Sequence, residues 1–322
     1  MKEQVSNAVS GRAAFYIRLF GTLLAIALMV YLLSQQGWEE IKAAFQQIPV
    51  WRLFVAMALM FISRIAVAGR WHVLLHSADS NVTPWDTLRV TFAGLFASNF
   101  LPTTVGGDVI RLAGAIQLKI DAAISAASLI VDRLVGMAGM AMMVPFALPN
   151  ILAARDSTIN SFSQYRYMIG GILPASITKW VTPLWNKGKK LLRRVIAALA
   201  IWQKQPRSLL ESLAFTWMNM LGLFSVLYVI FQGMDEDLSI WLIGGLYSVV
   251  YLITLLPFSI NGYGIQEVSM TFIFSSIGGA SVSSSLTAAL IFRTMMMIAS
   301  LPGAFFVPGL LAGSRSQPGI EK

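Results

Sequence analysis

Seven ionisable residues lie inside apolar stretches of the chain, where charged side chains are rare and usually serve a purpose. They are Arg64, Asp108, Arg111, Asp132, Arg133, Glu267 and Arg293. Each would cost about 2.5–3.5 kcal/mol at the centre of a membrane-spanning helix, so these side chains must pair with one another or contact water. Guanidinium groups at such depth are suited to bind an anion, and carboxylates to pair with them.

Two similar sequence elements precede these charges, and each consists of Leu-Pro, a glycine-containing turn and a carboxylate. The turn residues are Pro102, Gly106 and Gly107 in the first element, and Pro257, Asn261, Gly262 and Gly264 in the second. Proline ends the entering helix, and glycine permits a positive φ and close approach of the backbone. Arg133 follows the first element at a spacing similar to that of Arg293 after the second, which predicts an internal duplication.

The composition identifies the class of protein that must position these residues. The chain has 322 residues, of which 56% are hydrophobic and 12% charged, and its mean hydropathy is +0.68. These values indicate a polytopic membrane protein, because a soluble core could not hide so much apolar surface. The absence of cysteine excludes disulfides and sulfur-ligated metals. The net charge of +9 is explained by cytosolic loops of a membrane protein, so we expect no nucleic-acid partner.

The hydrophobic pattern predicts an all-α fold with about six full transmembrane helices. Their expected ranges are 15–35, 51–75, 120–149, 168–185, 208–231 and 286–311. Two further apolar stretches, 86–118 and 238–280, contain the Leu-Pro/glycine elements and are either re-entrant broken-helix hairpins or full spans, which makes eight apolar segments in all. We expect one membrane domain over residues 1–322.

Basic residues favour hairpins over full spans. With two hairpins, both termini and the Lys/Arg-rich segment 186–207 face the cytosol, as the positive-inside rule requires. Each half, about 15–150 and 168–312, then has three full crossings, so the halves form an inverted-topology repeat with both hairpin tips near a central cavity. Apolar residues at helical spacing predict that 186–207 is a basic interfacial helix, although an ordinary cytosolic loop is the alternative.

Two interpretations of the buried charges are compatible. In the structural one, Asp108 caps the helix that leaves the first hairpin, Arg111 pairs with it, and the other charges form internal ion pairs. In the functional one, the half-helix N-termini near Gly107 and Gly264, together with Arg133 and Arg293, receive an anionic group such as a lipid phosphate. His72 and His76 have no third ligand in view, so we expect no metal site and no cofactor.

Several ordered blocks resemble the lysylphosphatidylglycerol synthase transmembrane family, also called flippase-like. They are residues 89–96, 99–102, 106–111, 132–136, 256–257, 262–267 and 289–293, together with Arg70-Trp71. The resemblance covers about residues 50–311 and implies a membrane domain that moves or accommodates lipids. The soluble domain that transfers an amino acid to lipid in bifunctional members has no counterpart here, so synthase activity and tRNA binding are not expected.

The favoured hypothesis is a lipid translocase of the bacterial cytoplasmic membrane. Its expected partners are membrane lipids, either an anionic phospholipid or a lipid-linked glycan, and the seven buried charges are the candidate headgroup-binding residues. One alternative is a membrane-embedded enzyme with Asp108 or Glu267 as general base, although no catalytic residue is assigned. Another is an accessory subunit that works with a separate lipid-modifying enzyme.

Overall fold

The structure is a computed structural model that describes residues 38–78, 80–99, 106–154, 205–255 and 262–307. Every regular element in these ranges is a helix, which confirms the predicted all-α class for the described part of the chain. The elements are α2 (Trp38–Gln47), α3 (Val50–Ser77), α4 (Pro84–Ser98), α5 (Gly106–Gln117), α6 (Ala122–Met143), η1 (Val144–Ala147), α7 (Leu148–Ala153), α10 (Pro206–Gly233), α11 (Ile240–Thr254), α12 (Ile265–Ser276), α13 (Val282–Ser300) and η2 (Leu301–Phe305).

Four helical segments are long and apolar enough to cross a membrane. They are Val50–Ser77, Ala122–Ala153, Pro206–Gly233 and Val282–Phe305. These segments correspond to four of the predicted spans, so the chain is a polytopic membrane protein. The predicted spans 15–35 and 168–185, and almost all of the basic segment 186–207, lie outside the described residues.

Side-chain caps and prolines set several helix boundaries. The N-cap side chains of Thr83, Asp121, Ser239 and Ser281 accept hydrogen bonds from backbone N–H groups of the first turn. Two spans change from α-helix to 3₁₀-helix where a proline removes a backbone donor. α6 gives way to η1 next to Pro145, and α13 gives way to η2 next to Pro302.

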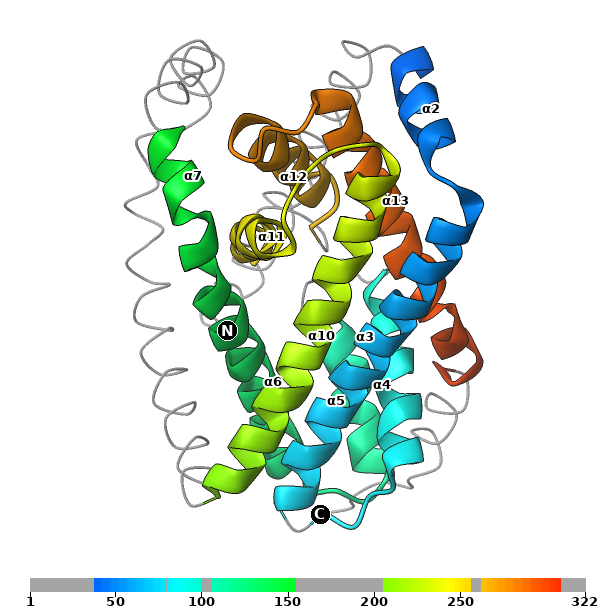
Figure 1. Cartoon of the computed structure of the whole chain (residues 1–322). Coiled ribbons are helices and arrows are strands. Elements are labelled where there is room, and N and C mark those ends of the chain that lie inside the picture. Colours follow the sequence, from blue (N-terminus) through cyan, green and yellow to red (C-terminus); the bar gives the residue numbers. More distant parts are fainter. Residues whose placement is uncertain (1–37, 79, 100–105, 155–204, 256–261, 308–322) are drawn as a thin grey trace, which may run out of the picture.

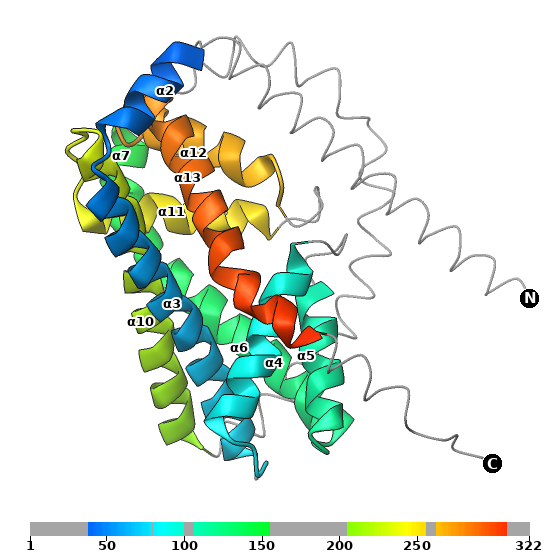
Figure 2. The same cartoon turned by 90° about the vertical axis from the view of Figure 1, so that its right-hand side faces the viewer.

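The long helices α3 and α10 pack side by side along one face of the molecule (Figures 1 and 2). Small residues allow this approach, because a Cβ on Gly222 would lie 3.0 Å from the Ser63 Cβ. A buried hydrogen bond of 2.7 Å from Ser63 Oγ to Asn219 Oδ1 joins the same two helices. Small residues and interhelical hydrogen bonds are the usual means of helix association in membranes, where the lipid is as apolar as the protein interior.

Each predicted hairpin consists of two short helices. A 15-residue helix, α4 or α11, is followed by a 12-residue helix, α5 or α12. Each of these helices is too short to cross the bilayer alone, since about 20 residues are needed. The connecting residues 100–105 and 256–261, which include the predicted tip residues Pro102, Pro257 and Asn261, lie outside the described ranges. Figure 2 shows the α4–α5 pair in the lower half of the molecule and the α11–α12 pair in the upper half.

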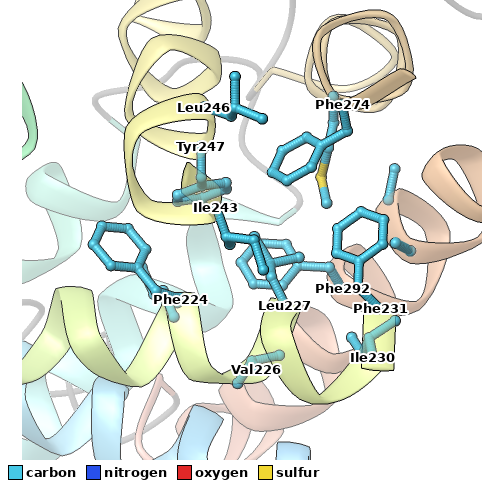
Figure 3. Close-up of a cluster of buried hydrophobic side chains, with 14 of the residues drawn as sticks. Phe224, Val226, Leu227, Ile230, Phe231, Ile243, Leu246, Tyr247, Phe274 and Phe292 are labelled. Carbon is cyan, nitrogen blue, oxygen red and sulfur yellow. The ribbon is translucent and has the colours of Figure 1, made fainter. Parts of the chain in front are cut away.

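Buried aromatic side chains hold α11 and α12 against α10 and α13 (Figure 3). Phe231 stacks on Phe274 with ring centroids 5.0 Å apart, and Tyr247 meets Phe292 edge-on at 5.2 Å. A smaller cluster around Trp71, Val90 and Leu129 supports α4 and α5. Both broken-helix pairs are therefore packed against long helices.

Candidate functional site

The first group of charges is a continuous network of three arginines and two aspartates, here called the aspartate cluster. Asp132 on α6 accepts from Arg70 Nε at 2.6 Å through Oδ1 and from Arg111 Nη1 at 3.0 Å through Oδ2. Arg111 Nη1 also lies 3.3 Å from Asp108 Oδ1, and the other oxygen of Asp108 accepts from Arg133 Nε. The network thus connects Asp132, which is only 1% exposed, to four other side chains. They are Arg70, Arg111, Asp108 and Arg133.

Neighbouring residues leave room for these large side chains. Arg111 lies over the Trp71 ring with its Cζ 4.4 Å from the ring centroid, a cation–π contact. A Cβ on Gly136 would come within 2.8 Å of Arg70 Nη1, and one on Gly94 within 2.7 Å of Arg111 Cγ. The glycines thus allow two guanidinium side chains to lie between closely packed helices.

The second group, here called the glutamate cluster, comprises Glu267, Arg293 and the turn before α12. Glu267 is 3% exposed; its Oε1 accepts from Arg293 Nε and its Oε2 accepts from the Gly264 N–H at 2.7 Å. Arg293 Nη2 also donates to the Gly262 carbonyl at 3.2 Å. Gly262 and Gly264 have φ values of 73° and 76°, which a residue with a side chain adopts only with strain. This turn needs its glycines.

The two broken-helix pairs meet directly. The Tyr263 hydroxyl donates to the Asn99 carbonyl at 3.0 Å, and the Asn99 amide donates to Ser300 Oγ at 2.7 Å. The Tyr263 ring also lies beneath Arg293, with the guanidinium Cζ 4.8 Å from the ring centroid. A single tyrosine therefore links the glutamate cluster to the end of α4.

Arg64 on α3 differs from the other buried arginines. Its side chain is 8% exposed, its Nη2 contacts Met60 Sδ at 3.6 Å, and its Nε has no hydrogen-bond partner among the described residues. No carboxylate in the described part of the chain forms an ion pair with it, and the like charge of Arg293 is within electrostatic reach. A buried charge in this state is costly unless water or an anionic ligand compensates it.

These groups surround one cavity of about 300 Å³. The charged residues of its wall are Arg64, Arg70, Arg111, Arg133, Arg293, Asp108 and Asp132. Glu267 adds one further negative charge through its pair with Arg293. Five positive charges thus meet three negative ones, so the wall has an excess of positive charge. An anion is the ligand that such a wall would attract.

The structure brings together all seven residues singled out in the sequence. Six of them line the cavity, and Glu267 contacts it through Arg293. The predicted pair of Arg111 with Asp108 is present, and Gly106 and Gly107 begin α5 as expected. Asp108 was expected to cap its helix, but the hydrogen bonds of its two oxygens within the described residues come from arginines. In the second half a carboxylate does make a capping contact, because Glu267 Oε2 accepts from the N–H of Gly264, the N-cap residue of α12. Among the described residues, no group of three potential metal ligands is present.

Several cavity residues were not expected from the sequence. In the structure, Arg70 belongs to the aspartate cluster. In the sequence it lies near the end of a predicted span, where arginine is an ordinary residue of the membrane interface. Its position six residues after Arg64 was the available signal, since two arginines in one span require two partners. Asn219, Tyr247, Tyr251 and Gln266 also line the cavity, and no sequence pattern distinguishes them from other polar residues of apolar helices.

Comparison with known proteins agrees with the membrane architecture. A search of curated proteins gave no match. The family model described as "Lysylphosphatidylglycerol synthase TM region" matches residues 18–303, a range that contains every described helix from α2 to α13. The chain is therefore a membrane protein of lipid modification or transport, and it belongs to the lysylphosphatidylglycerol synthase transmembrane family.

Proposed function

We propose that this protein is a lipid translocase that moves an anionic lipid headgroup through the central cavity while the acyl chains stay in the bilayer. The observation that carries the proposal is Arg64, a buried cation that lines the cavity and has no carboxylate partner among the described residues. A phosphate group at this position would compensate the charge of Arg64 and contact Arg293 as well.

The helix lengths support the predicted inverted repeat. α3 and α10 each have 28 residues, and each is followed by a 15-residue and a 12-residue helix. The packing is also reciprocal. Gly303 in η2 lies against the Phe92 carbonyl of α4, while Gly245 in α11 lies against the Ala147 backbone of η1. Such repeats commonly place a transport site between their halves.

In the proposed cycle, a headgroup enters the cavity, displaces water from Arg64 and Arg293, and leaves on the opposite side. Arg133 is a suitable first contact, because 39% of its side chain is exposed, more than for the other arginines of the two clusters. The bacterial cytoplasmic membrane, cytosolic termini and a single domain over residues 1–322 complete the proposal, on the basis of the charge distribution of the sequence.

The enzyme alternative is less well supported. A general base needs a carboxylate oxygen that is available to a reacting proton. Both oxygens of Asp108 accept from arginines, and both of Glu267 accept from Arg293 and the Gly264 N–H. No observation favours the accessory-subunit alternative, so we retain the translocase.

The test is lipid movement in vesicles that contain the purified protein. Tail-labelled anionic lipid should cross faster than in protein-free vesicles, and Arg64→Gln should slow it by about tenfold, the effect of one lost charge-assisted contact. Arg207→Gln is the matched control, because 92% of that side chain is exposed and it pairs with Glu211 at the start of α10. Movement no faster than in protein-free vesicles, across a panel of anionic lipids, would refute the proposal.

A further inference from the structure

Arg64 lies beside the contact between the two long helices α3 and α10. Ser63, its neighbour on α3, hydrogen-bonds Asn219 on α10, and each of these two residues is the fourteenth of its helix. A contact between residues at the same position of two helices is expected where a two-fold axis relates the halves of the proposed repeat. Arg64 is therefore next to this proposed axis, on the wall of the cavity.

Two buried ion pairs occupy matching positions in the two halves. Asp108 is the third residue of α5, and Glu267 is the third residue of α12. Their partners, Arg133 and Arg293, are each the twelfth residue of α6 and of α13. In both pairs the carboxylate accepts from the Nε of the arginine. Positions counted from the helix starts thus match residues that have the same role.

Arg64 has no charged counterpart by the same count. It is the fifteenth residue of α3, and the fifteenth residue of α10 is Met220, which is 0% exposed. A long helix therefore packs at this position with an apolar side chain, so the fold does not require a cation there. Burying an arginine that has no ion pair with a described residue costs free energy, and binding of a ligand would offset that cost.

Hydrogen-bond donors accompany Arg64 on the cavity wall. Its own Nε has no acceptor among the described residues. Asn219 accepts from Ser63 through Oδ1, and its amide N–H groups donate to no described residue. The Tyr247 hydroxyl has no hydrogen bond within the described ranges, and Tyr247 is within electrostatic reach of Arg64. One cation and two neutral donors are a suitable set of ligands for a small anion.

We infer that a small inorganic anion such as chloride binds beside Arg64 when no headgroup is present. A single negative charge compensates the one guanidinium of the wall that has no ion pair among the described residues. Binding of the anion does not depend on translocation. Its consequence does rest on the proposed function: the headgroup displaces the anion from Arg64, so a soluble anion slows lipid movement by competition.

Thermal unfolding in an uncharged detergent tests the site without any lipid movement. The purified protein is compared in sodium chloride and in sodium gluconate at equal concentration, so that both samples have the same ionic strength. Chloride should raise the Tm by about 2–4 °C, and the rise should saturate, because the ligand binds only the folded state. Equal Tm values in the two salts would overturn the inference.

Replacement of Arg64 assigns the chloride effect to this residue. Arg64→Met introduces the side chain found at the matching position of α10, so the variant should fold and should lose the chloride-dependent rise in Tm. Arg207→Gln is the matched control and should keep the rise, because 92% of the Arg207 side chain is exposed. A rise that persists in Arg64→Met would show that chloride binds elsewhere.

A second variant supplies the negative charge from the protein itself and serves also if Arg64→Met fails to fold. Asn219→Asp keeps an oxygen that can accept from Ser63 and places a carboxylate next to the neighbour of Arg64. This carboxylate should take the place of the anion, so the Tm should no longer depend on chloride. A chloride-dependent rise of unchanged size in Asn219→Asp would contradict the proposed site.

A conservative variant tests the neutral donors. Tyr247→Phe removes one hydroxyl from the site, so several-fold more chloride should be needed for half of the rise in Tm. Tyr228→Phe is the matched control, since Tyr228 is 37% exposed on α10, and it should need the same concentration as the unchanged protein. An unchanged requirement in Tyr247→Phe would contradict the assignment of this hydroxyl.

Vesicles that contain the purified protein test the competition. Movement of tail-labelled anionic lipid should be several-fold slower in sodium chloride than in sodium gluconate. If lipid moves at the same rate in both salts while the Tm still depends on chloride, the site stands and the competition is refuted. If no lipid moves faster than in protein-free vesicles, translocation is refuted, and the Tm measurements decide on the anion site independently.

Discussion

The two halves of the cavity wall satisfy their charges differently. In the aspartate cluster, Arg70, Arg111 and Arg133 share two carboxylates, so each guanidinium has at least one anionic partner. In the wall near the glutamate cluster, Arg293 has Glu267, whereas Arg64 has no ion pair with any described residue. In the first arrangement every arginine has an anionic partner, and in the second one arginine has none among the described residues.

This difference separates stabilising charges from binding charges. A network in which every carboxylate oxygen has a donor stabilises the helices that it joins, because removing one partner exposes another buried charge. An arginine without such a partner adds no ion pair to the stability of the fold, and its charge attracts an anion. Paired and unpaired arginines line the same cavity, so measurements of stability and of lipid movement should distinguish them.

The largest expected effect is loss of stability in Asp132→Asn. This change leaves Arg70 and Arg111 without their shared anionic partner, and breaking a buried ion pair costs about 3–5 kcal/mol. Glu267→Gln removes the partner of one arginine only and keeps an oxygen for the Gly264 N–H, so it should destabilise less. Thermal unfolding in detergent, followed by tryptophan fluorescence, measures both.

The matched control for this pair is Glu211→Gln, because Glu211 is half exposed and its ion pair with Arg207 is solvated. Its Tm should equal that of the unchanged protein. A Glu267→Gln protein less stable than Asp132→Asn would reverse the assignment of the aspartate cluster as the main stabilising network.

Much of the architecture could be predicted from the sequence, for identifiable physical reasons. Apolar runs long enough to span a bilayer located α3, α6, α10 and α13, and the Leu-Pro/glycine elements located the breaks between α4 and α5 and between α11 and α12. Intramembrane charge is so costly that each such residue signals a special environment. The sequence predicts the seven buried charges on that ground alone.

The partners of these charges could not be predicted. Asp132 lies beside Arg133 in the sequence, yet it binds Arg70, which precedes it by 62 residues, and Arg111, which precedes it by 21. Such pairs depend on how helices rotate and cross, which hydrophobic periodicity does not determine. The contact of Tyr263 with Asn99, across 164 residues, is a further example.

A second prediction distinguishes Arg64 from Arg111 by methionine substitution. Arg111→Met leaves one oxygen of Asp132 and one of Asp108 without this donor, which should lower the free energy of unfolding by about 1–3 kcal/mol. Arg64→Met removes no ion pair with a residue that the structure describes, and it should change that free energy by less than about 1 kcal/mol.

For Arg64, substitution should affect the rate of lipid movement more than it affects stability. The Arg64→Met protein should fold normally and yet move anionic lipid about tenfold more slowly, since the uncompensated cation is gone. Loss of stability in Arg64→Met comparable to that in Arg111→Met would show that Arg64 belongs to a closed network, and the contrast between the two walls would fail.

The smallest expected effect concerns the hydrogen bond from Tyr263 to the Asn99 carbonyl, which links the two halves of the cavity wall. Tyr263→Phe keeps the ring beneath Arg293 but removes the hydrogen bond to the Asn99 carbonyl, which is worth about 0.5–1.5 kcal/mol. If the two broken-helix pairs separate when a headgroup passes, this bond opposes the separation, and the variant should be slightly less stable while moving lipid faster. Tyr228→Phe, on the exposed face of α10, is again the control. A slower Tyr263→Phe protein of unchanged stability would instead assign the hydroxyl to headgroup binding, and the two walls would then act on the lipid together rather than part to let it through.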